Sequence, residues 1–192
     1  MNARDLIAFE AEVAEAFNDK RILAPVHLSG GNEDFLIEIF KDVHPGDWVF
    51  STYRNHYHAL LHGIPREQVM AQIINGHSMN LCFPEHLFYT SAIVGGILSI
   101  AVGAALAERR SGGTRKVWCF VGDMAASTGQ FHEAVKYSEG FDLSIRFVVE
   151  DNSLSCDSPT DLCWGNTVEA RARRYTYKRV WPHTNTGKWL TF

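Results

Sequence analysis

Residues 116–152, which read KVWCFVGDMAASTGQFHEAVKYSEGFDLSIRFVVEDN, determine the fold that we expect for this chain. The continuous apolar run 117–121 is typical of a strand that is buried on both faces of a sheet. Residues 122–128 predict a loop, residues 130–139 a helix that Gly140 caps, and residues 144–150 a second strand. A strand, a helix and a strand within this length predict a parallel sheet flanked by helices, which is an α/β fold.

Both predicted strands end in residues with oxygen donors. Asp123 follows the first strand, and Asn152 follows the second, 29 positions later. Because ligands of such folds bind beyond the carboxyl ends of the parallel strands, we expect these two side chains to meet at one edge of the sheet. A carboxylate, an amide oxygen and one or two loop carbonyls suit Mg²⁺ or Ca²⁺, and Mg²⁺ often keeps phosphate oxygens as further ligands. The helix that begins near Gly129 would direct N–H groups towards a diphosphate.

Each of these residues also has an ordinary structural explanation. Asp123 suits the N-terminal cap of the following helix. Asp151 and Asn152 suit a turn, because such side chains readily bond to the nearby backbone. The two strand ends taken together favour the metal site, and the structural roles stay open as alternatives.

The remainder of the chain predicts further elements around the sheet. Residues 3–18 have the spacing of an amphipathic helix, with apolar positions at Leu6, Ile7, Val13, Ala14 and Phe17. We also expect a helix over 33–40, a short apolar run at 48–50, a short helix over 66–74, a helix of small residues over 92–110 and a solvated strand edge at 175–179. The length favours one domain over residues 1–192, with an N-terminal helical arm at about 1–24 and a divergent C-terminal part at about 156–192.

Charge and hydropathy exclude some classes of partner. Eighteen basic residues stand against 22 acidic ones, a formal net charge of −4, which disfavours binding to nucleic acid or to an anionic membrane surface. Residues 87–107 carry no formal charge and are long enough to span a bilayer. Their polar residues and glycines, and the charged residues 108–110 that follow, favour a buried helix instead.

The cysteines and the N-terminus predict a cytoplasmic protein. No Cys-x-x-Cys pair occurs among Cys82, Cys119, Cys156 and Cys163, so we do not expect a zinc site. The first 20 residues lack the apolar core of a signal peptide. A reducing compartment is therefore the expected location.

Several short motifs resemble those of one enzyme family. Gly122-Asp123-Met124 and Glu150-Asp151-Asn152 resemble the Gly-Asp-Gly…Asn-Asn signature of thiamine-diphosphate enzymes. Further segments are similar, in the same order, to motifs of the alpha subunits of the two-subunit 2-oxo acid dehydrogenases: residues 26–33, Tyr53-Arg54-Asn55-His56, Gly76-His77-Ser78-Met79 and Ile93-Val94-Gly95. The chain therefore resembles these alpha subunits (the pyruvate, branched-chain and acetoin types), which are related to transketolases.

The resemblance implies a role for each matching residue. Asp123, Asn152 and the backbone carbonyl of Leu154 would bind Mg²⁺. Tyr53 and Arg54 would hold the diphosphate, for which the planar, permanently charged guanidinium is well suited. The other implied positions are Ala92 and Val94 at the aminopyrimidine, Gly122, Met124 and Ala125 in the diphosphate loop, and the catalytic residues His27, His56 and His77. An ion pair between Arg54 and a surface carboxylate, and structural roles for the three histidines, remain the alternatives.

The chain departs from the family pattern in three places. Met124 replaces the third motif glycine, so the diphosphate loop is expected to differ slightly or to bind more weakly. Asn80 replaces a histidine, which removes a group that transfers protons. The family's chains continue well beyond residue 192, and residues 175–192 do not match their pattern. These departures affect above all how the chain would recognise its substrate and a lipoyl partner.

The resemblance implies half of an active site. In this family the glutamate that activates the cofactor belongs to a beta subunit, so we expect an α2β2 heterotetramer with thiamine diphosphate and Mg²⁺ at the subunit interface. The expected reaction is decarboxylation of a 2-oxo acid, with acyl transfer to a lipoyl or carrier-protein acceptor. The alternatives are transketolase-like transfer of a two-carbon ketol unit and a non-catalytic regulatory homologue. An unrelated nucleotide-binding domain is disfavoured, because the chain lacks Gly-x-Gly-x-x-Gly and a P-loop lysine.

Overall fold

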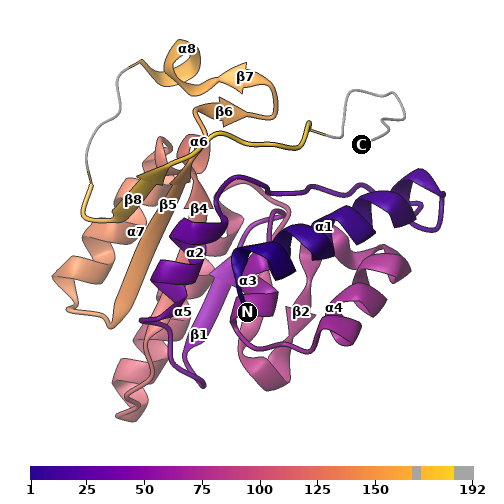
Figure 1. Ribbon diagram of the computed structural model, residues 1–192. Helices are drawn as coiled ribbons and strands as arrows, with labels where there is room; N and C mark the ends of the chain where they lie inside the picture. The colour runs from indigo at the N-terminus through magenta and orange to yellow at the C-terminus, as the bar shows by residue number, and fades with distance from the viewer. Residues whose placement is uncertain (166–169, 184–192) are drawn as a thin grey trace.

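A six-stranded sheet runs through the centre of the computed structural model, which describes residues 1–165 and 170–183 (Figure 1). The strand order is β2-β3-β1-β4-β5-β8, with β2 antiparallel to β3 and every other pair parallel. The strands are β1 (Trp48–Ser51), β2 (Cys82–Phe83), β3 (Phe88–Thr90), β4 (Val117–Gly122), β5 (Ile145–Asp151) and β8 (Arg173–Thr176). The predicted parallel sheet is confirmed, with one antiparallel strand added at its edge.

Alternate residues of β4 face two separate apolar layers. Trp118 and Phe120 pack into the cluster on one side of the sheet, and Val117, Cys119 and Val121 pack into the cluster on the other side. All five are buried. The continuous apolar run in the sequence is therefore explained by a central strand with no face towards solvent.

Helices cover both faces of the sheet (Figure 1). The first layer contains α1 (Ala3–Asn18), α2 (Glu33–Phe40), α3 (His56–Leu61) and α4 (Arg66–Gln72), and the second contains α5 (Gly96–Ser111), α6 (Asp123–Ala126) and α7 (Gly129–Gly140). The short elements are the π-helical turn η1 (Ile73–His77), the 3₁₀ turns η2 (Ser78–Asn80) and η3 (Pro84–His86), the hairpin β6 (Leu154–Ser155) and β7 (Ser158–Pro159), and α8 (Thr160–Trp164). The arrangement is a three-layer α/β fold.

α1 has the bounds that the sequence predicts. The side chain of Asn2 accepts a hydrogen bond from the N–H of Asp5, and the Asp5 carboxylate accepts one from the N–H of Asn2, which forms a capping box. The predicted apolar face was wrong at Ile7, which is 51 % exposed, because Phe9 joins Leu6 on the buried face instead. The helix over 33–40 is also confirmed, whereas the one predicted over 66–74 ends at Gln72 and continues as η1.

Three other predictions differ from the structure. α5 begins at Gly96 rather than at residue 92, because Gly95 has a φ of 77°, which a right-handed helix does not allow. The predicted loop 122–128 contains the short helix α6. Residues 175–179 are not simply a solvated edge, because Tyr175 and Tyr177 are buried beside β5.

The uncharged residues 87–107 form β3 and most of α5 rather than one long helix. Among the described residues, no helix combines the length and the apolar character needed to cross a membrane. The prediction of one domain over the whole chain stays a prediction, because residues 166–169 and 184–192 of the divergent C-terminal part lie outside the described residues.

Candidate functional site

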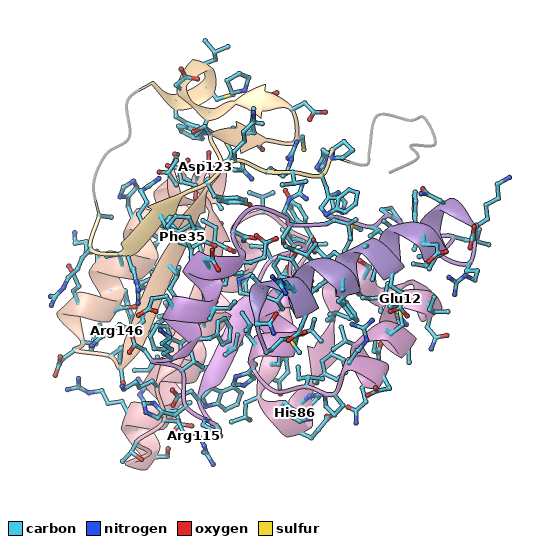
Figure 2. All side chains as sticks on the ribbon, in the orientation of Figure 1. Glu12, Phe35, His86, Arg115, Asp123 and Arg146 are labelled. Carbon is cyan, nitrogen blue, oxygen red and sulfur yellow. The ribbon has the colours of Figure 1, made fainter. Side chains whose placement is uncertain are left out.

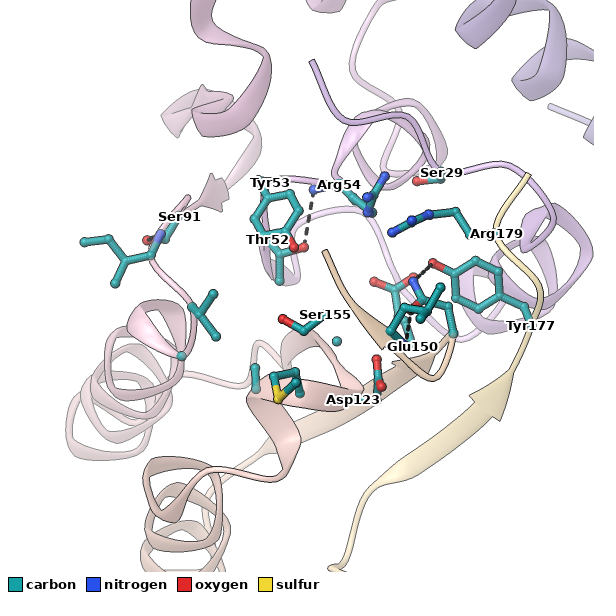
Figure 3. Close-up of a pocket in the computed structure, with 18 residues that line it drawn as sticks. Ser29, Thr52, Tyr53, Arg54, Ser91, Asp123, Glu150, Ser155, Tyr177 and Arg179 are labelled. Carbon is teal, nitrogen blue, oxygen red and sulfur yellow. Dashed lines mark hydrogen bonds between the residues drawn. The ribbon is translucent and has the colours of Figure 1, made fainter. Parts of the chain in front are cut away.

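The segments that follow the carboxyl ends of the parallel strands surround a cavity (Figure 3). Its empty volume, including space open to solvent, is about 660 Å³, which is within the range of small-molecule sites. The predicted site residues that line it are Tyr53, Arg54, Val94, Gly122, Asp123, Met124, Ala125, Asn152 and Leu154. Ala92 does not line the cavity, although its neighbours Ser91 and Ile93 do.

Asp123 is a buried carboxylate in the cavity wall. It is 3 % exposed, and within the described part of the chain no basic side chain forms an ion pair with it. Oδ2 accepts a hydrogen bond from the hydroxyl of Thr160. The side chain makes no capping bond to α6, so the N-cap alternative is wrong. Burial raises the pKa of Asp123, and a divalent cation would supply the positive charge that the carboxylate lacks.

Asn152 and Leu154 place further oxygen donors beside the same cavity. Oδ1 of Asn152 accepts a hydrogen bond from the N–H of Leu154 at 3.0 Å, and Nδ2 donates one to the hydroxyl of Tyr177 at 3.1 Å. Asn152 therefore closes a turn, as the structural alternative requires, and lines the cavity as well. The Asp151 carboxylate pairs with Arg174 at 2.7 Å and is occupied by that contact.

The oxygen donors fit a hard cation. The described residues contain no group of three or more His, Cys, Asp or Glu side chains that could hold a metal ion. A site here would instead combine the carboxylate of Asp123, the amide oxygen of Asn152 and a backbone carbonyl such as that of Leu154, which is a donor set typical of Mg²⁺ with phosphate oxygens as additional ligands.

Two guanidinium groups lie in the cavity wall on the opposite side from Asp123 (Figure 3). Arg54 is 7 % exposed, donates to the carbonyl of Leu28 and lies 3.1 Å from Nδ1 of His183, so the alternative of a surface ion pair is wrong. Arg179, which the sequence analysis did not single out, has a buried side chain and bonds to Asp157. Burial, and then the charge of Arg179, lower the pKa of Arg54. Two such cations on one wall favour an anionic ligand.

Met124 lies in α6 without backbone strain. It is a residue of the right-handed helix α6, and it does not have the positive φ that requires glycine. Its sulfur accepts a hydrogen bond from Nε1 of Trp164 at 2.7 Å. The backbone therefore gives no support to the expected difference in loop conformation, and the alternative of weaker binding stays a prediction.

The three predicted catalytic histidines occupy different environments, and none lines the cavity. His27 is buried behind Tyr53, with ring centroids 4.7 Å apart, and burial followed by the charge of Arg54 lowers its pKa to about 3. His56 is fully buried, with Nε2 2.9 Å from the hydroxyl of Ser78. His77 is exposed. The catalytic roles of the three histidines stay a prediction.

A set of buried polar contacts behind the cavity was not predicted from the sequence. Glu150 lines the cavity, and its carboxylate contacts His58, Asn32 and Tyr175. A signal for part of this set was available. Tyr175 and Tyr177 are two residues apart, so in a strand both side chains point to the same face.

Gly95 lies beside the cavity where β3 leads into α5. Its φ is 77°, and a Cβ there would lie 2.6 Å from Oε1 of Gln130. Glycine is therefore required for the backbone conformation, whereas the Gln130 side chain could rotate away from a Cβ. Asn80, which replaces the family's histidine, is exposed.

Comparison with known proteins identifies similar sequences. The family model for the dehydrogenase E1 component matches residues 1–163. The alpha subunit of acetoin:2,6-dichlorophenolindophenol oxidoreductase from Bacillus subtilis is 29 % identical over 187 residues, which cover 92 % of this chain and 56 % of that protein. The pyruvate dehydrogenase E1 component subunit alpha of Porphyra purpurea is 32 % identical over 161 residues, which cover 75 % and 47 % of the two chains. The chain spans about half the length of these relatives.

Proposed function

The chain belongs to the dehydrogenase E1 component family, and on that premise we propose that it is the diphosphate- and metal-binding half of a thiamine-diphosphate enzyme. The proposed reaction cleaves the bond next to the carbonyl of a 2-oxo acid and passes the acyl group to a lipoyl or carrier-protein acceptor. The observation that carries the proposal is that Asp123, Asn152 and Arg54 meet at one cavity beyond the strand ends.

Metal binding is supported by the negative charge of Asp123 and by the oxygen donors beside it. Asp123, Asn152 and the carbonyl of Leu154 would hold Mg²⁺, and the buried Asp123 carboxylate has no cationic partner among the described residues. A buried carboxylate that keeps its charge needs a compensating positive charge, and a divalent ion bridging to a diphosphate would supply it.

The diphosphate half rests on the donors across the cavity. Tyr53, Arg54 and Arg179 line that wall. The contacts of the Arg54 guanidinium with the Leu28 carbonyl and with His183 leave further N–H groups for a ligand. When bound, thiamine diphosphate would supply the electron sink for cleavage of the bond. The residues of this chain would anchor the diphosphate and orient it through the metal. His27, which lies behind Tyr53, would provide a neutral imidazole close to the site.

Exposed apolar side chains at the rim of the cavity are evidence for a partner subunit. Ile93 and Val94 line the cavity and are 75 % and 54 % exposed, and Ile100 on α5 is 55 % exposed. Large exposed apolar side chains at the rim of a polar site are typical of a surface that another protein covers. We therefore place a beta-type subunit against this face, in an α2β2 heterotetramer with the cofactor between the subunits.

The second candidate is a non-catalytic regulatory homologue, which is favoured by Asn80 in place of a histidine. For either function we propose a cytoplasmic location, because Cys82, Cys119, Cys156 and Cys163 are all free thiols.

The test of the proposed function is a titration of thiamine diphosphate in the presence and absence of Mg²⁺. It uses the chain purified together with its partner subunit and compares the wild type with Asp123→Ala, Asn152→Ala and Asp19→Ala, a control at an exposed aspartate. Metal-dependent binding that is lost in the first two variants and kept in the control supports the proposal. Absence of metal-dependent binding in the wild type would sink it. Binding without turnover of 2-oxo acids or ketoses would select the regulatory homologue.

A further inference from the structure

The short helix α8 contacts the predicted metal loop through two side chains. The hydroxyl of Thr160 donates a hydrogen bond to Oδ2 of Asp123, and Nε1 of Trp164 donates one to the sulfur of Met124 at 2.7 Å. α8 lies far along the chain from α6, so these contacts are set by the tertiary fold. Figure 1 shows α8 and the β6–β7 hairpin above the carboxyl ends of the strands.

Thr160 also contacts the second strand end. Its backbone N–H donates a hydrogen bond to the carbonyl of Ser153 at 3.1 Å, and Ser153 lies between Asn152 and Leu154. Pro159, the residue before Thr160, pairs with Leu154 in the β6–β7 hairpin. One residue therefore joins the two segments that would supply the metal ligands, with its hydroxyl on the carboxylate and its backbone on the loop.

The direction of the Thr160 hydrogen bond determines what it does to Asp123. A threonine hydroxyl has one proton, and here that proton is donated to Oδ2. The carboxylate plane is thereby fixed, the ionised form is favoured, and Oδ1 is the oxygen that Thr160 does not contact. We propose that Thr160 is a positioning residue that holds the Asp123 carboxylate with Oδ1 available to a divalent cation. This inference rests on the proposed function, because it requires that the cation bind at Asp123.

Thr160 acts in this account through Asp123 and does not itself contact the metal. Groups that orient a metal ligand in this way typically change metal affinity by about 10–100-fold when they are replaced. Thr160→Val keeps the branched shape and removes only the hydroxyl, whereas Thr160→Ser keeps the hydroxyl. The matched control is Thr114→Val, the same substitution at an exposed position.

The test is a titration with Mn²⁺, followed by electron paramagnetic resonance, of the chain purified with its partner. The wild type and Thr114→Val should bind Mn²⁺ equally, Thr160→Val should bind on the order of tenfold more weakly, and Thr160→Ser should restore most of the affinity. The second readout is thermal unfolding. Without metal, Thr160→Val should have a lower Tm than Thr114→Val, because the buried Asp123 carboxylate loses its hydrogen bond. Mn²⁺ should raise the Tm of Thr160→Val by less than it raises the Tm of the wild type and of Thr114→Val.

Each result decides between named possibilities. Equal Mn²⁺ affinity of Thr160→Val and wild type, with Asp123→Ala unable to bind, overturns the inference and leaves the proposed function standing. Tighter binding by Thr160→Val also overturns it, because the hydroxyl would then compete with the metal. No Mn²⁺ binding by the wild type overturns the proposed function together with the inference.

Discussion

Nε2 of His58 lies 3.2 Å from Oε2 of Glu150, and neither side chain is more than 7 % exposed. Glu150 is the residue of β5 that lines the cavity next to Asp151, and its Oε1 accepts hydrogen bonds from Asn32 and Tyr175. The contacts join α3 in the first layer to β5 and β8 of the sheet. The cavity wall is thus supported by a buried polar cluster whose residues come from different segments of the chain. Figure 2 draws the side chains of the described residues on the ribbon.

Removal of His58 should destabilise the fold. His58→Ala removes a fully buried ring that contacts Glu150, and cutting a buried side chain back to alanine typically costs about 2–5 kcal/mol. Urea unfolding measures the loss. His44→Ala, at an exposed histidine, should change the free energy of unfolding by no more than about 0.5 kcal/mol. Equal effects of the two substitutions would show that the cluster does not stabilise the chain.

His27 should make stability depend on pH. Burial and the charge of Arg54 lower its pKa from 6.5 to about 3, so between these values the unfolded chain binds a proton that the folded chain does not. The free energy of unfolding should therefore fall as the pH is lowered through this window, by up to about 1.4 kcal/mol per pH unit.

The His27→Gln variant isolates this contribution, because glutamine does not titrate. Urea unfolding at pH 7, 6 and 5 should show the stability advantage of the wild type over the variant shrinking as the pH is lowered. A constant difference between the two proteins would contradict the buried, neutral state of His27.

Gly95 and Gly103 should respond in opposite ways to alanine. At Gly95 the φ of 77° opposes a Cβ, so Gly95→Ala should cost about 1–2 kcal/mol. At Gly103, within α5, a Cβ would meet nothing within 4 Å, so Gly103→Ala should stabilise the helix by about 0.5–1 kcal/mol. Thermal unfolding of both variants checks the prediction, which fails if Gly95→Ala is as stable as Gly103→Ala.

Restoring the family's glycine at position 124 should not improve the site. Met124 has an ordinary helical backbone in α6, so Met124→Gly should be about 1 kcal/mol less stable than Met124→Ala. Titration with thiamine diphosphate and Mg²⁺ should give the same affinity for both variants. A much higher affinity of both variants than of the wild type would mean that the methionine side chain obstructs the diphosphate. A higher affinity of Met124→Gly alone would mean that the site needs the backbone freedom of glycine.

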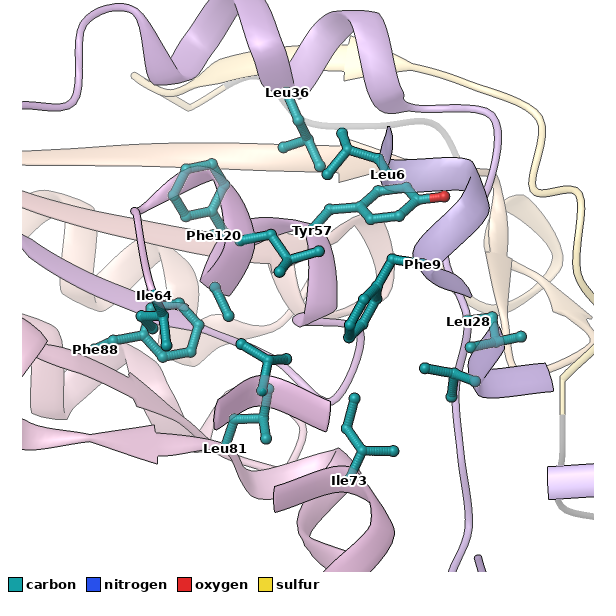
Figure 4. Packing of buried hydrophobic residues seen from close by; sticks show 14 of the residues in the cluster. Leu6, Phe9, Leu28, Leu36, Tyr57, Ile64, Ile73, Leu81, Phe88 and Phe120 are labelled. Carbon is teal, nitrogen blue, oxygen red and sulfur yellow. The ribbon is translucent and has the colours of Figure 1, made fainter. Parts of the chain in front are cut away.

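The local sequence pattern predicted which helices and strands are present better than it predicted the residues at which they begin and end. The apolar run 117–121 indicated a central strand, and its residues alternate between two apolar layers. One of these layers contains Phe9 and Tyr57 (Figure 4). The start of α5 was misplaced because a single backbone angle at Gly95 decides it. The apolar spacing of residues 92–95 gives no sign of that angle.

The candidate site was predictable where its residues follow predicted strands. Asp123 and Asn152 meet at one cavity because β4 and β5 are adjacent and parallel. Arg179 and the contact between Glu150 and His58 were missed because they depend on pairings between distant segments, including the pairing of β8 with β5. Sequence spacing alone does not determine which strand takes an edge position.

The most direct test of the central claim is an anomalous difference map from crystals of the complex grown with Mn²⁺ and thiamine diphosphate. The account predicts one metal peak bonded to the Asp123 carboxylate, the Asn152 amide oxygen and the Leu154 carbonyl, at about 2.1 Å from each oxygen. Thiamine diphosphate bound with its metal held by other residues, or with no metal peak at Asp123, would contradict it.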